Sequence, residues 1–428
     1  QGQWNVYQTK NSLETYHIPP FEAAIEKNAA SIMPYYAKPS REKSADQYDL
    51  QGNPIEWKPV GFAFNDYFIQ ELLKKQMGFK GYINSDSGIV QNMAWGVEEL
   101  EVCERVALAV HAGVDIISGS YDIEAAKEAY RRGKEGYYTT QGHKVPEGYT
   151  VEQVTLSDQA LTQAAAHTLR EKFELGLFED PYRDPRKAVE VVATKKDWEN
   201  AADVHRKSVV LLKNQGTLPL TEEKTEGKKV YAQCFNKKEE DGVKATEELK
   251  KMLEKEKGIT LTDKPEEADY ALLFLTPSSG EYFNATPGYL ELEICDGKEV
   301  CDVDEEGRPA KTTHTETTLS GAKKISEIAK TVHDRGGKVI ANINFTLAWE
   351  VGTVEPYADG LLAGFDTYPW AVLDVIFGRF SPVGKMPITL PKDDSVLKVS
   401  PEGVCISPND VPGYDKDKYM PKSMKDEN

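Results

Sequence analysis

Helical and strand-like segments alternate along the first 185 residues, and this alternation restricts the folds open to the chain. Segment 65–79, NDYFIQELLKKQMGF, places apolar residues at helical spacing, and the apolar segment 81–86, GYINSD, follows it. The same succession occurs at 97–113, typical of a helix, and at 114–120, typical of a strand. Strands that alternate with helices at this spacing predict βαβ units and a parallel sheet.

The number of these units matters as much as their order. An earlier unit consists of a helix at 18–29 and a strand at 30–36, so about three units precede residue 185. A closed (β/α)8 barrel needs eight strands, and three strands cannot close one. The first block is therefore expected to be either a small open sheet or the end of a barrel whose front is absent from the sequence.

A second α/β block begins near residue 205. Its clearest strand candidates are three apolar runs at 270–275, 338–345 and 360–365, with helical stretches among them. This succession predicts an open sheet with helices on both faces. The polar, turn-rich segment 293–317 is predicted to be a long loop or a small insertion.

These patterns divide the chain into four parts. Gly176 and a Pro-containing loop end the long helix that precedes residue 185, which places a domain boundary there. We expect a first domain at 1–185, a charged linker at 186–204, a second domain at 205–392 and a C-terminal tail at 393–428.

The composition argues against several classes of partner and cofactor. The net charge of −18 and the pI near 5.0 disfavour binding to nucleic acid or to an anionic membrane surface. No apolar run approaches the roughly 18 residues of a membrane span. The 5 cysteines and 7 histidines show neither C-x-x-C nor H-x-x-x-H spacing, so no metal or other cofactor is expected. Cys295 and Cys301 lie near enough in sequence to pair in an oxidising compartment.

Asp86 ends the strand-like segment GYINSD and stands just before a Ser-Gly turn. In parallel α/β architectures, ligands bind beyond the carboxyl ends of the strands, where a carboxylate can act on them. Aspartate also caps helices and forms turns. Position alone therefore leaves a catalytic and a structural interpretation of Asp86 open.

The neighbourhood of Asp86 resembles a segment of glycoside hydrolase family 3. LLKKQMGFKGYINSDSGIV is similar to the family segment in which a helix ending in G-F-x-G leads to a strand finishing in S-D-W. Further resemblances follow in the family's order, namely HIPPFEAAIEKNAASIMPYY, RVALAVHAGVDIISGS, HTLREKFELGLFEDPYRDP, HRKSVVLLKNQGTLPL and YPWAVLDVIFGRFSPVGKMPITLP. The matches run colinearly from about residue 13 to residue 391, and the chain is therefore identified as a member of this family.

The resemblance implies an α/β fold, the C-terminal part of a (β/α)8-type barrel followed by an α/β sandwich domain with a parallel-rich sheet. The front of the family's barrel has no counterpart in the sequence, which explains the shortage of strands. A processed or split protein is therefore expected, with a companion fragment that carries the front of the barrel. A homo-oligomer is also compatible with the sequence.

The resemblance further implies a retaining exo-β-glycosidase, most plausibly β-glucosidase-like, in which Asp86 is the nucleophile. Such an enzyme needs a second carboxyl group that protonates the leaving oxygen. Glu281, in an S-G-E stretch after the strand at 270–275, is the first choice for this acid/base. Glu291 is the second choice, with Glu293 close behind it and Glu316 as a weaker alternative.

Several other positions match the family's sugar site in part. Met33 and Tyr36 match an M-x-x-Y motif in which the tyrosine lies against the nucleophile, although barrel packing explains both equally well; Tyr35 is the neighbouring alternative. Ser87 stands where the family usually has a tryptophan, and Trp95 is a possible substitute as a stacking surface. The Asp115 carboxylate matches an A-G-x-D motif and is expected to be structural.

Other functions stay open at this point. A β-xylosidase or β-N-acetylhexosaminidase of the same family is the nearer alternative. A non-catalytic carbohydrate-binding subunit is the other, because Ser87 replaces the tryptophan and the barrel front is missing. The family tendency favours a periplasmic or secreted location.

Overall fold

The computed structural model describes residues 4–7, 9–136, 138, 144–280, 291–303, 309–388, 390, 391 and 393. These residues form two compact units whose boundary falls in sequence between Asp184 and Pro185, next to the expected boundary at 185. The first unit precedes this boundary and the second follows it.

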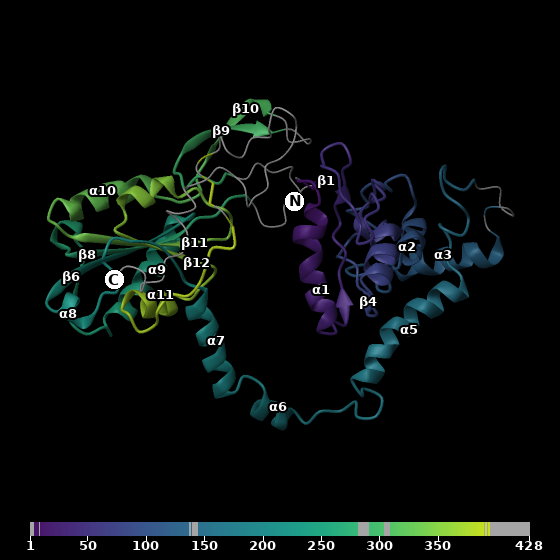
Figure 1. Ribbon diagram of the computed structural model, residues 1–428, viewed down its shortest axis with the longest axis horizontal. Helices are drawn as coiled ribbons and strands as arrows, with labels where there is room; N and C mark the ends of the chain where they lie inside the picture. The colour runs from purple at the N-terminus through teal and green to yellow at the C-terminus, as the bar shows by residue number, and fades with distance from the viewer. Residues whose placement is uncertain are drawn as a thin grey trace. The chain divides into compact units, whose positions relative to one another are not determined.

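The first unit combines helices with very short parallel strands (Figure 1). Its helices are α1 (Ile18–Glu26), α2 (Val102–Ala112), α3 (Ile123–Glu135) and α5 (Asp158–Glu174), and further helical segments span Leu13–His17, Phe62–Phe64 and Tyr67–Gln76. Its strands pair in parallel, β1 (Trp4–Asn5) with β3 (Lys38–Pro39) and β2 (Ser31–Ile32) with β4 (Tyr82–Ile83). A parallel bridge between Asn84 and Ile116 adds a third segment beside β4.

Local sequence explains where the helices of the first unit begin and end. Glu101 and Glu104 form a reciprocal capping box at the start of α2, and Gly113 ends that helix with a φ of 111°. Asp122 caps α3 and Ser157 caps α5 through side chains that accept backbone N–H bonds. The core behind these helices contains wholly buried apolar residues of β4, of the following turn and of α2, including Ile83, Ile89, Val90, Ala107 and Ala109.

The second unit is built on a six-stranded sheet of order β5–β12–β11–β8–β6–β7. The strands are β5 (Val210–Asn214), β6 (Lys228–Asn236), β7 (Ile259–Thr262), β8 (Tyr270–Thr276), β11 (Lys338–Asn344) and β12 (Gly360–Gly364). All neighbouring pairs are parallel except β12 and β5, which are antiparallel. The predicted parallel-rich α/β sheet is therefore confirmed.

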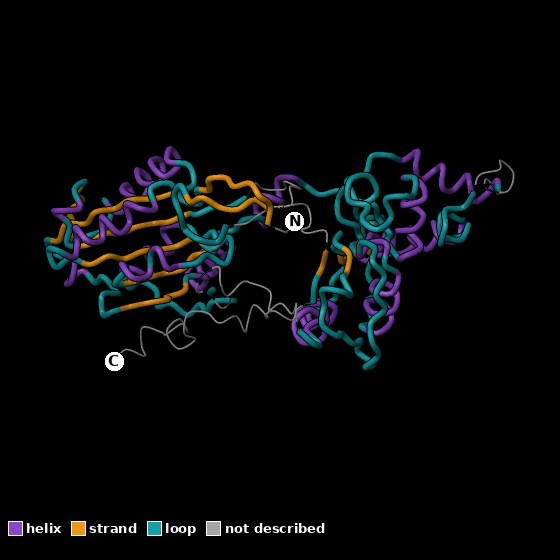
Figure 2. Tube along the Cα trace, turned by 90° about the horizontal axis from the view of Figure 1, so that it is seen from above, coloured by secondary structure: helices purple, strands orange, loops and turns teal. Residues whose placement is uncertain are grey.

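Helices cover both faces of this sheet (Figure 2). α10 (Ala322–His333) packs on one face, in a cluster with alternate strand residues such as Leu273 and Ala341. α9 (Glu239–Leu253) and α11 (Pro369–Ile376) cover the other face, in a cluster with Leu272 and Ile340. Because both faces are covered, β8 is almost continuously apolar, which made it visible in the sequence.

The segment 293–317 contains more regular structure than predicted. β9 (Lys298–Val303) and β10 (Pro309–Glu316) pair there as an antiparallel hairpin, so a long loop was the wrong prediction and a small insertion describes it better. In the first unit the opposite holds, because the strand expected at 30–36 is limited to Ser31–Ile32. Pro34 lacks an N–H and cannot continue a ladder there.

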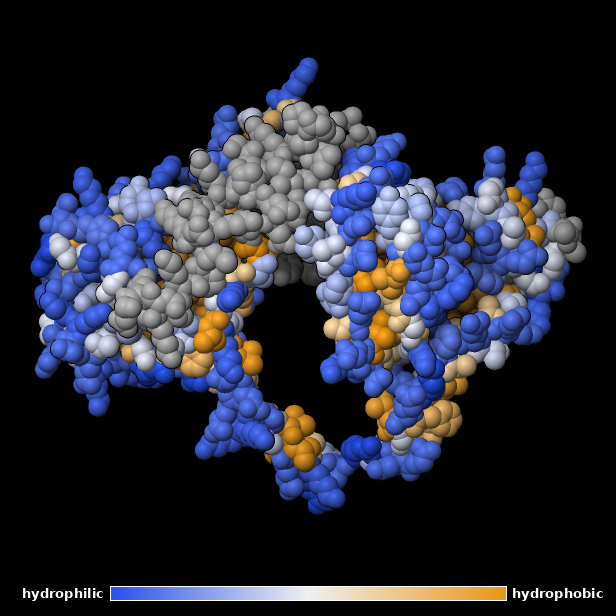
Figure 3. Space-filling view, in the orientation of Figure 1, coloured by the Kyte–Doolittle hydropathy of each residue, from blue (hydrophilic) through white to orange (hydrophobic). Residues whose placement is uncertain are grey.

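Two helices connect the boundary to the sheet of the second unit. α6 (Pro185–Val191) has no buried residue, whereas α7 (Lys195–Ser208) is joined to α11 by the ion pair of Arg206 with Asp374 at 2.6 Å. The remaining short helix, α8 (Glu222–Thr225), precedes β6. Hydrophobic side chains are exposed along α6, including Val189 and Val191, and on α5, including Phe173 (Figure 3).

Three further properties bear on function. Among the described residues, no helix has the length and apolar character needed to cross a bilayer. The same residues contain no group of three metal-ligating side chains that could hold an ion. Cys103, Cys234, Cys295 and Cys301 are free thiols, and Cys405 lies outside the described residues.

Candidate active site

In the first unit, β2, β4 and the segment at Ile116 share one carboxyl-terminal edge. β2 aligns with β4 through the pairs Ser31–Tyr82 and Ile32–Ile83, and Ile116 lies beside Asn84. Residues that follow these strands therefore emerge on the same side. Asp86 follows β4, Met33 to Tyr36 follow β2, and the loop from Ser118 follows the third segment.

Asp86 is half-buried and its backbone is fixed from both sides. Its carboxylate accepts the N–H of Ser87 at 2.6 Å, while its carbonyl oxygen accepts the hydroxyl of Ser85 at 2.8 Å. The Ser85 Oγ also accepts the N–H of Ser118 at 2.9 Å. These bonds hold Asp86 at the edge of the strands.

Tyr36 is the predicted site residue with the clearest link to Asp86. Burial raises the pKa of its phenol, and the neighbouring Tyr35 and the Asp86 carboxylate raise it further. The hydroxyl therefore stays protonated at neutral pH and can act only as a neutral group beside the carboxylate. Its ring is stacked on Tyr35 at 4.9 Å and meets Trp95 edge-on at 5.6 Å between centroids.

The other predicted sugar-site residues differ in their surroundings. Trp95 is partly buried against Tyr36, so its ring is already engaged in packing. Ser87 is exposed and packs against Gly119, where a Cβ would lie only 2.6 Å from the Ser87 Cβ. Met33 is exposed and lines an apolar cavity of about 320 Å³ together with Tyr35.

Asp115 has the surroundings of a structural carboxylate. Its side chain is 4% exposed, accepts the N–H of Ile83 at 2.8 Å and bonds to His167 Nδ1 at 2.8 Å. Lys74 Nζ lies 3.8 Å away, and burial lowers the pKa of this lysine despite the neighbouring carboxylate. Because Ile83 lies three residues before Asp86, Asp115 fixes the strand that carries the proposed nucleophile.

The acid/base candidates lie in the second unit. Glu281 is outside the described residues. The described strand that precedes it in sequence, β8, ends at Thr276 and lies beside β6, where the strand order reverses. Ligands bind at such a switch point in open α/β sheets.

Glu291 is locked in place. Its side chain is 0% exposed, with one oxygen 3.0 Å from Lys298 Nζ and the other accepting the N–H of Glu293 at 2.8 Å. Lys298 also pairs with Glu293 at 2.6 Å, and although burial opposes it, the two carboxylates raise the pKa of Lys298. Glu316, on β10, pairs with Lys237 at 3.2 Å. A carboxylate as enclosed as that of Glu291 cannot reach a substrate without rearrangement.

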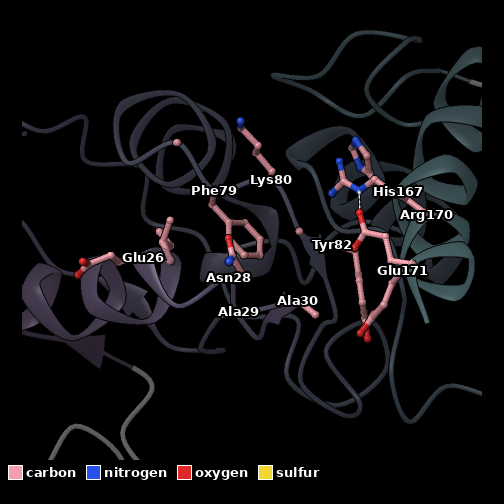
Figure 4. A pocket seen from close by; sticks show the side chains of 14 residues that line it. Glu26, Asn28, Ala29, Ala30, Phe79, Lys80, Tyr82, His167, Arg170 and Glu171 are labelled. Carbon is pink, nitrogen blue, oxygen red and sulfur yellow. Dashed lines mark ion pairs between the residues drawn. The ribbon is translucent and has the colours of Figure 1, made fainter. Parts of the chain in front are cut away.

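A larger pocket lies away from this edge. It has a volume of about 510 Å³ and is lined by residues at the amino-terminal ends of β2 and β4, including Ala30 and Tyr82. Figure 4 shows His167, Arg170 and Glu171 of α5 on one side of it and Glu26 of α1 on the other. It opens at the end of the strands opposite to Asp86, so its size does not make it the reaction site.

Sequence reasoning missed the serines that position Asp86. The Ser118 hydroxyl donates to Asn84 Oδ1 at 2.7 Å, and its backbone bond to Ser85 completes a link between two neighbouring strand ends. The S-D and S-G-S stretches in the sequence were the available signal, because serines beside a strand end commonly make local backbone bonds.

Two family models match the chain. The family model "Glycosyl hydrolase family 3 N terminal domain" matches residues 2–137, and "Glycosyl hydrolase family 3 C-terminal domain" matches residues 209–421. The chain belongs to glycosyl hydrolase family 3. The predicted resemblance is thereby confirmed over both units.

Curated relatives of this family 3 chain carry glycosidase names. A "Probable beta-glucosidase C" of Aspergillus flavus is 28% identical over 404 residues, which cover 92% of this chain and 52% of the relative. A "Periplasmic beta-glucosidase/beta-xylosidase" of Dickeya chrysanthemi is 31% identical over 284 residues, covering 62% of this chain and 36% of the relative. The family 3 chain thus spans about half the length of the first of these relatives.

Solved structures confirm the fold. A β-glucosidase from Listeria innocua, in complex with isofagomine, matches with a TM-score of 0.58 at 19% identity, over 91% of this chain and 49% of that one. β-Glucosidase 3B from Thermotoga neapolitana matches with a TM-score of 0.54 at 21% identity, over 94% of this chain and 53% of that one. Barrel-derived and sandwich units in one chain are therefore the fold of this family 3 member.

Proposed function

We propose that this family 3 chain takes part in the hydrolysis of terminal β-linked sugars, β-glucosides foremost, with retention of configuration through a glycosyl–Asp86 intermediate. The observation that carries the proposal is the place of Asp86 at the carboxyl edge of the strands, with its backbone fixed by Ser85 and Ser118. The names of the relatives support a β-glycosidase.

The proposed reaction has two steps. The Asp86 carboxylate attacks the anomeric carbon while the acid/base protonates the glycosidic oxygen, so the C–O bond to the leaving group breaks as the ester forms. The acid/base then removes a proton from water, which attacks the same carbon and releases Asp86. Tyr36, protonated near the carboxylate, contributes no negative charge of its own.

A fluorinated inhibitor tests the nucleophile. Incubation with a 2-deoxy-2-fluoro β-glucoside traps the covalent intermediate, and peptide mass spectrometry is expected to locate the label on the peptide that contains Asp86. Asp86→Asn abolishes labelling in the proposed mechanism. A label on another carboxylate would refute the assignment.

Glu281 is the acid/base that we propose. The enclosure of Glu291 between Lys298 and the Glu293 N–H supports a structural role for that residue. Glu281→Ala is expected to lose turnover and to regain it with azide, an anionic nucleophile that attacks the glycosyl–Asp86 intermediate in place of water and needs no general base. Azide rescue of Glu291→Ala or Glu316→Ala instead would transfer the role.

One set of assays tests which sugar is recognised and whether the chain catalyses hydrolysis. Relatives named for β-glucosidase and β-xylosidase activity support either glycone, so a panel of nitrophenyl β-glucoside, β-xyloside and β-N-acetylhexosaminide distinguishes them. Binding of glucose without turnover of any substrate would instead favour a carbohydrate-binding subunit.

We further propose that additional polypeptide completes the barrel around Asp86. Among the described residues, β2, β4 and the segment at Ile116 are the three parallel segments aligned at the Asp86 edge, and this supports the proposal because eight strands are needed for closure. The test compares the chain alone with the chain mixed with a polypeptide that supplies the other strands. Size-exclusion chromatography measures whether the two associate, and full hydrolytic activity of the chain alone would contradict the proposal. The word "periplasmic" in the names of two relatives supports an exported location.

A further inference from the structure

The loop Ser118–Tyr121 is fastened to the turn that carries Asp86. Gln91 Nε2 donates to the Ser120 hydroxyl at 2.6 Å, in addition to the bond between the Ser118 N–H and Ser85. The backbone of Gly119 lies directly against Ser87, since a Cβ on this glycine would fall 2.6 Å from the Ser87 Cβ. Loop and turn therefore form one packed edge.

Tyr121 ends this loop, and hydrogen bonds of Tyr121 and of the next residue, Asp122, fix the backbone there. Its carbonyl oxygen accepts the N–H of Ile123 at 3.1 Å, and the Asp122 carboxylate accepts the Ala125 N–H at 3.0 Å to cap α3. Its side chain is nevertheless 98% exposed, so both faces of the ring are open to solvent. An aromatic ring on a fixed backbone offers a large apolar surface at little entropic cost on binding.

Tyr36 and Trp95, two aromatic residues near Asp86, are already engaged in packing. Tyr36 is buried between Tyr35 and Trp95, and the Trp95 ring meets Tyr36 edge-on. Ser87, directly after Asp86, offers no ring at all. Sugar sites combine a few polar groups with an apolar surface, and Tyr121 presents such a surface on the same edge.

We propose that Tyr121 provides the aromatic face against which a sugar ring of the substrate packs when its anomeric carbon is presented to Asp86. This inference rests on the proposed function, and it makes Tyr121 a specificity-determining residue. A pyranose has a face of C–H groups that an aromatic ring covers, while its hydroxyl groups remain available to polar partners. The ring, and not the phenolic hydroxyl, carries the interaction.

Kinetics of matched variants test the role of the ring. Tyr121→Ala is expected to raise the KM for nitrophenyl β-glucoside about threefold to tenfold, with kcat within about twofold, because packing is lost from both ground and transition states. Tyr121→Phe keeps the wild-type KM. Tyr182→Ala serves as the control, because Tyr182 is 87% exposed on a segment remote in sequence from the Asp86 turn.

Calorimetric titration with glucose gives a readout that does not need turnover. Tyr121→Ala is expected to weaken glucose binding by a similar factor, with unchanged thermal unfolding. Wild-type affinity in Tyr121→Ala would overturn the inference, as would a Tyr121→Phe variant as weak as Tyr121→Ala or a wild-type chain that binds no glucose. Glucose binding that depends on Tyr121 without turnover would support the inference while contradicting the proposed hydrolysis.

Discussion

Asp115 in the first unit and Asp359 in the second stand in the same relation to the strands around them. Each precedes a strand segment, and each exchanges two hydrogen bonds with one residue of the neighbouring strand. The Asp115 N–H donates to the Ile83 carbonyl at 2.9 Å while its carboxylate accepts the Ile83 N–H at 2.8 Å. Asp359 does the same with Val339, at 2.8 Å and 2.9 Å.

Their further partners are also alike. Asp359 pairs with His333 at 2.8 Å and with Lys338 at 3.0 Å, as Asp115 pairs with His167 and Lys74. What differs is the sheet that each one supports. Around Asp359 the sheet has six strands with helices on both faces, whereas β4 beside Asp115 is only two residues long. The paired hydrogen bonds of the aspartate therefore add to an extensive sheet in the second unit, whereas in the first unit they are a main support of the short strand.

Removal of the carboxylate at Asp115 is expected to have the largest effect. Asp115→Ala leaves the buried Ile83 N–H and His167 without their acceptor, and the loss of unfolding free energy should be about 3 kcal/mol. The Asp86 strand then loosens, so turnover falls and the Ile83 amide exchanges faster. Urea unfolding and hydrogen exchange measure both. Asp115→Asn, which retains an acceptor, is the control, and equal loss in both variants would contradict this account.

The Asp359 side chain is buried to a similar degree, with 8% exposed. Asp359→Ala is nevertheless expected to cost less unfolding free energy, about 2 kcal/mol, because the larger sheet also holds the strand in place. Hydrogen exchange should accelerate at Val339. Turnover should stay at the wild-type level, since Asp359 lies at the amino-terminal end of β12 and is remote in sequence from Asp86 and Glu281. A loss of turnover comparable with that of Asp115→Ala would break the comparison.

Acid should weaken the second unit through Asp359. Burial raises the pKa of this carboxyl, but the Val339 N–H, Lys338 and His333 outweigh burial and lower it below the ordinary value of 3.8. A depressed pKa adds stability that is present above the ordinary value and is lost as the pH falls through the folded-state value. Urea unfolding from pH 6 downward should therefore show a steeper fall for the wild type than for Asp359→Asn. Parallel curves would exclude this contribution.

Substitution of Asp269 should have the smallest effect on stability, because Asp269 makes the same pair of hydrogen bonds with a neighbouring strand but lies near the surface. Its carboxylate accepts the Lys229 N–H at 2.9 Å, and its side chain is 36% exposed. Water can replace the carboxylate there, so Asp269→Ala should cost only about 0.5 kcal/mol by urea unfolding. A loss as large as that of Asp359→Ala would show that burial does not set the strength of these bonds.

The strands that the sequence revealed are those with both faces covered. β8 and β12 are continuous apolar runs and were predicted, whereas β6, which begins with two lysines and alternates polar residues, was not. In the first unit, segment 114–120 yielded only a bridge at Ile116, because local apolar character does not determine how many residues find a ladder partner.

The site was predictable to a similar, partial extent. Asp86 and Tyr36 were proposed from motifs, since those motifs keep residues at fixed distances along the chain. The bonds of Ser85 with Ser118 and of Asp115 with Ile83 depend on the register between segments more than 30 residues apart, which no local pattern contains. The roles assigned to Asp86 and Glu281 stay predictions.

The antiparallel pairing of β5 with β12 has a consequence for the order of synthesis. β5 is the first strand of its sheet to leave the ribosome, and its partner β12 is the last. In the same way, α7 cannot form its ion pair with α11 until Asp374, 168 residues after Arg206, has been synthesised. During this interval the apolar β5 has no ladder partner and is open to wrong pairing. The sheet of the second unit can be completed only after β12 has been synthesised, so ribosomal pauses before β12 prolong the time in which β5 is open to wrong pairing.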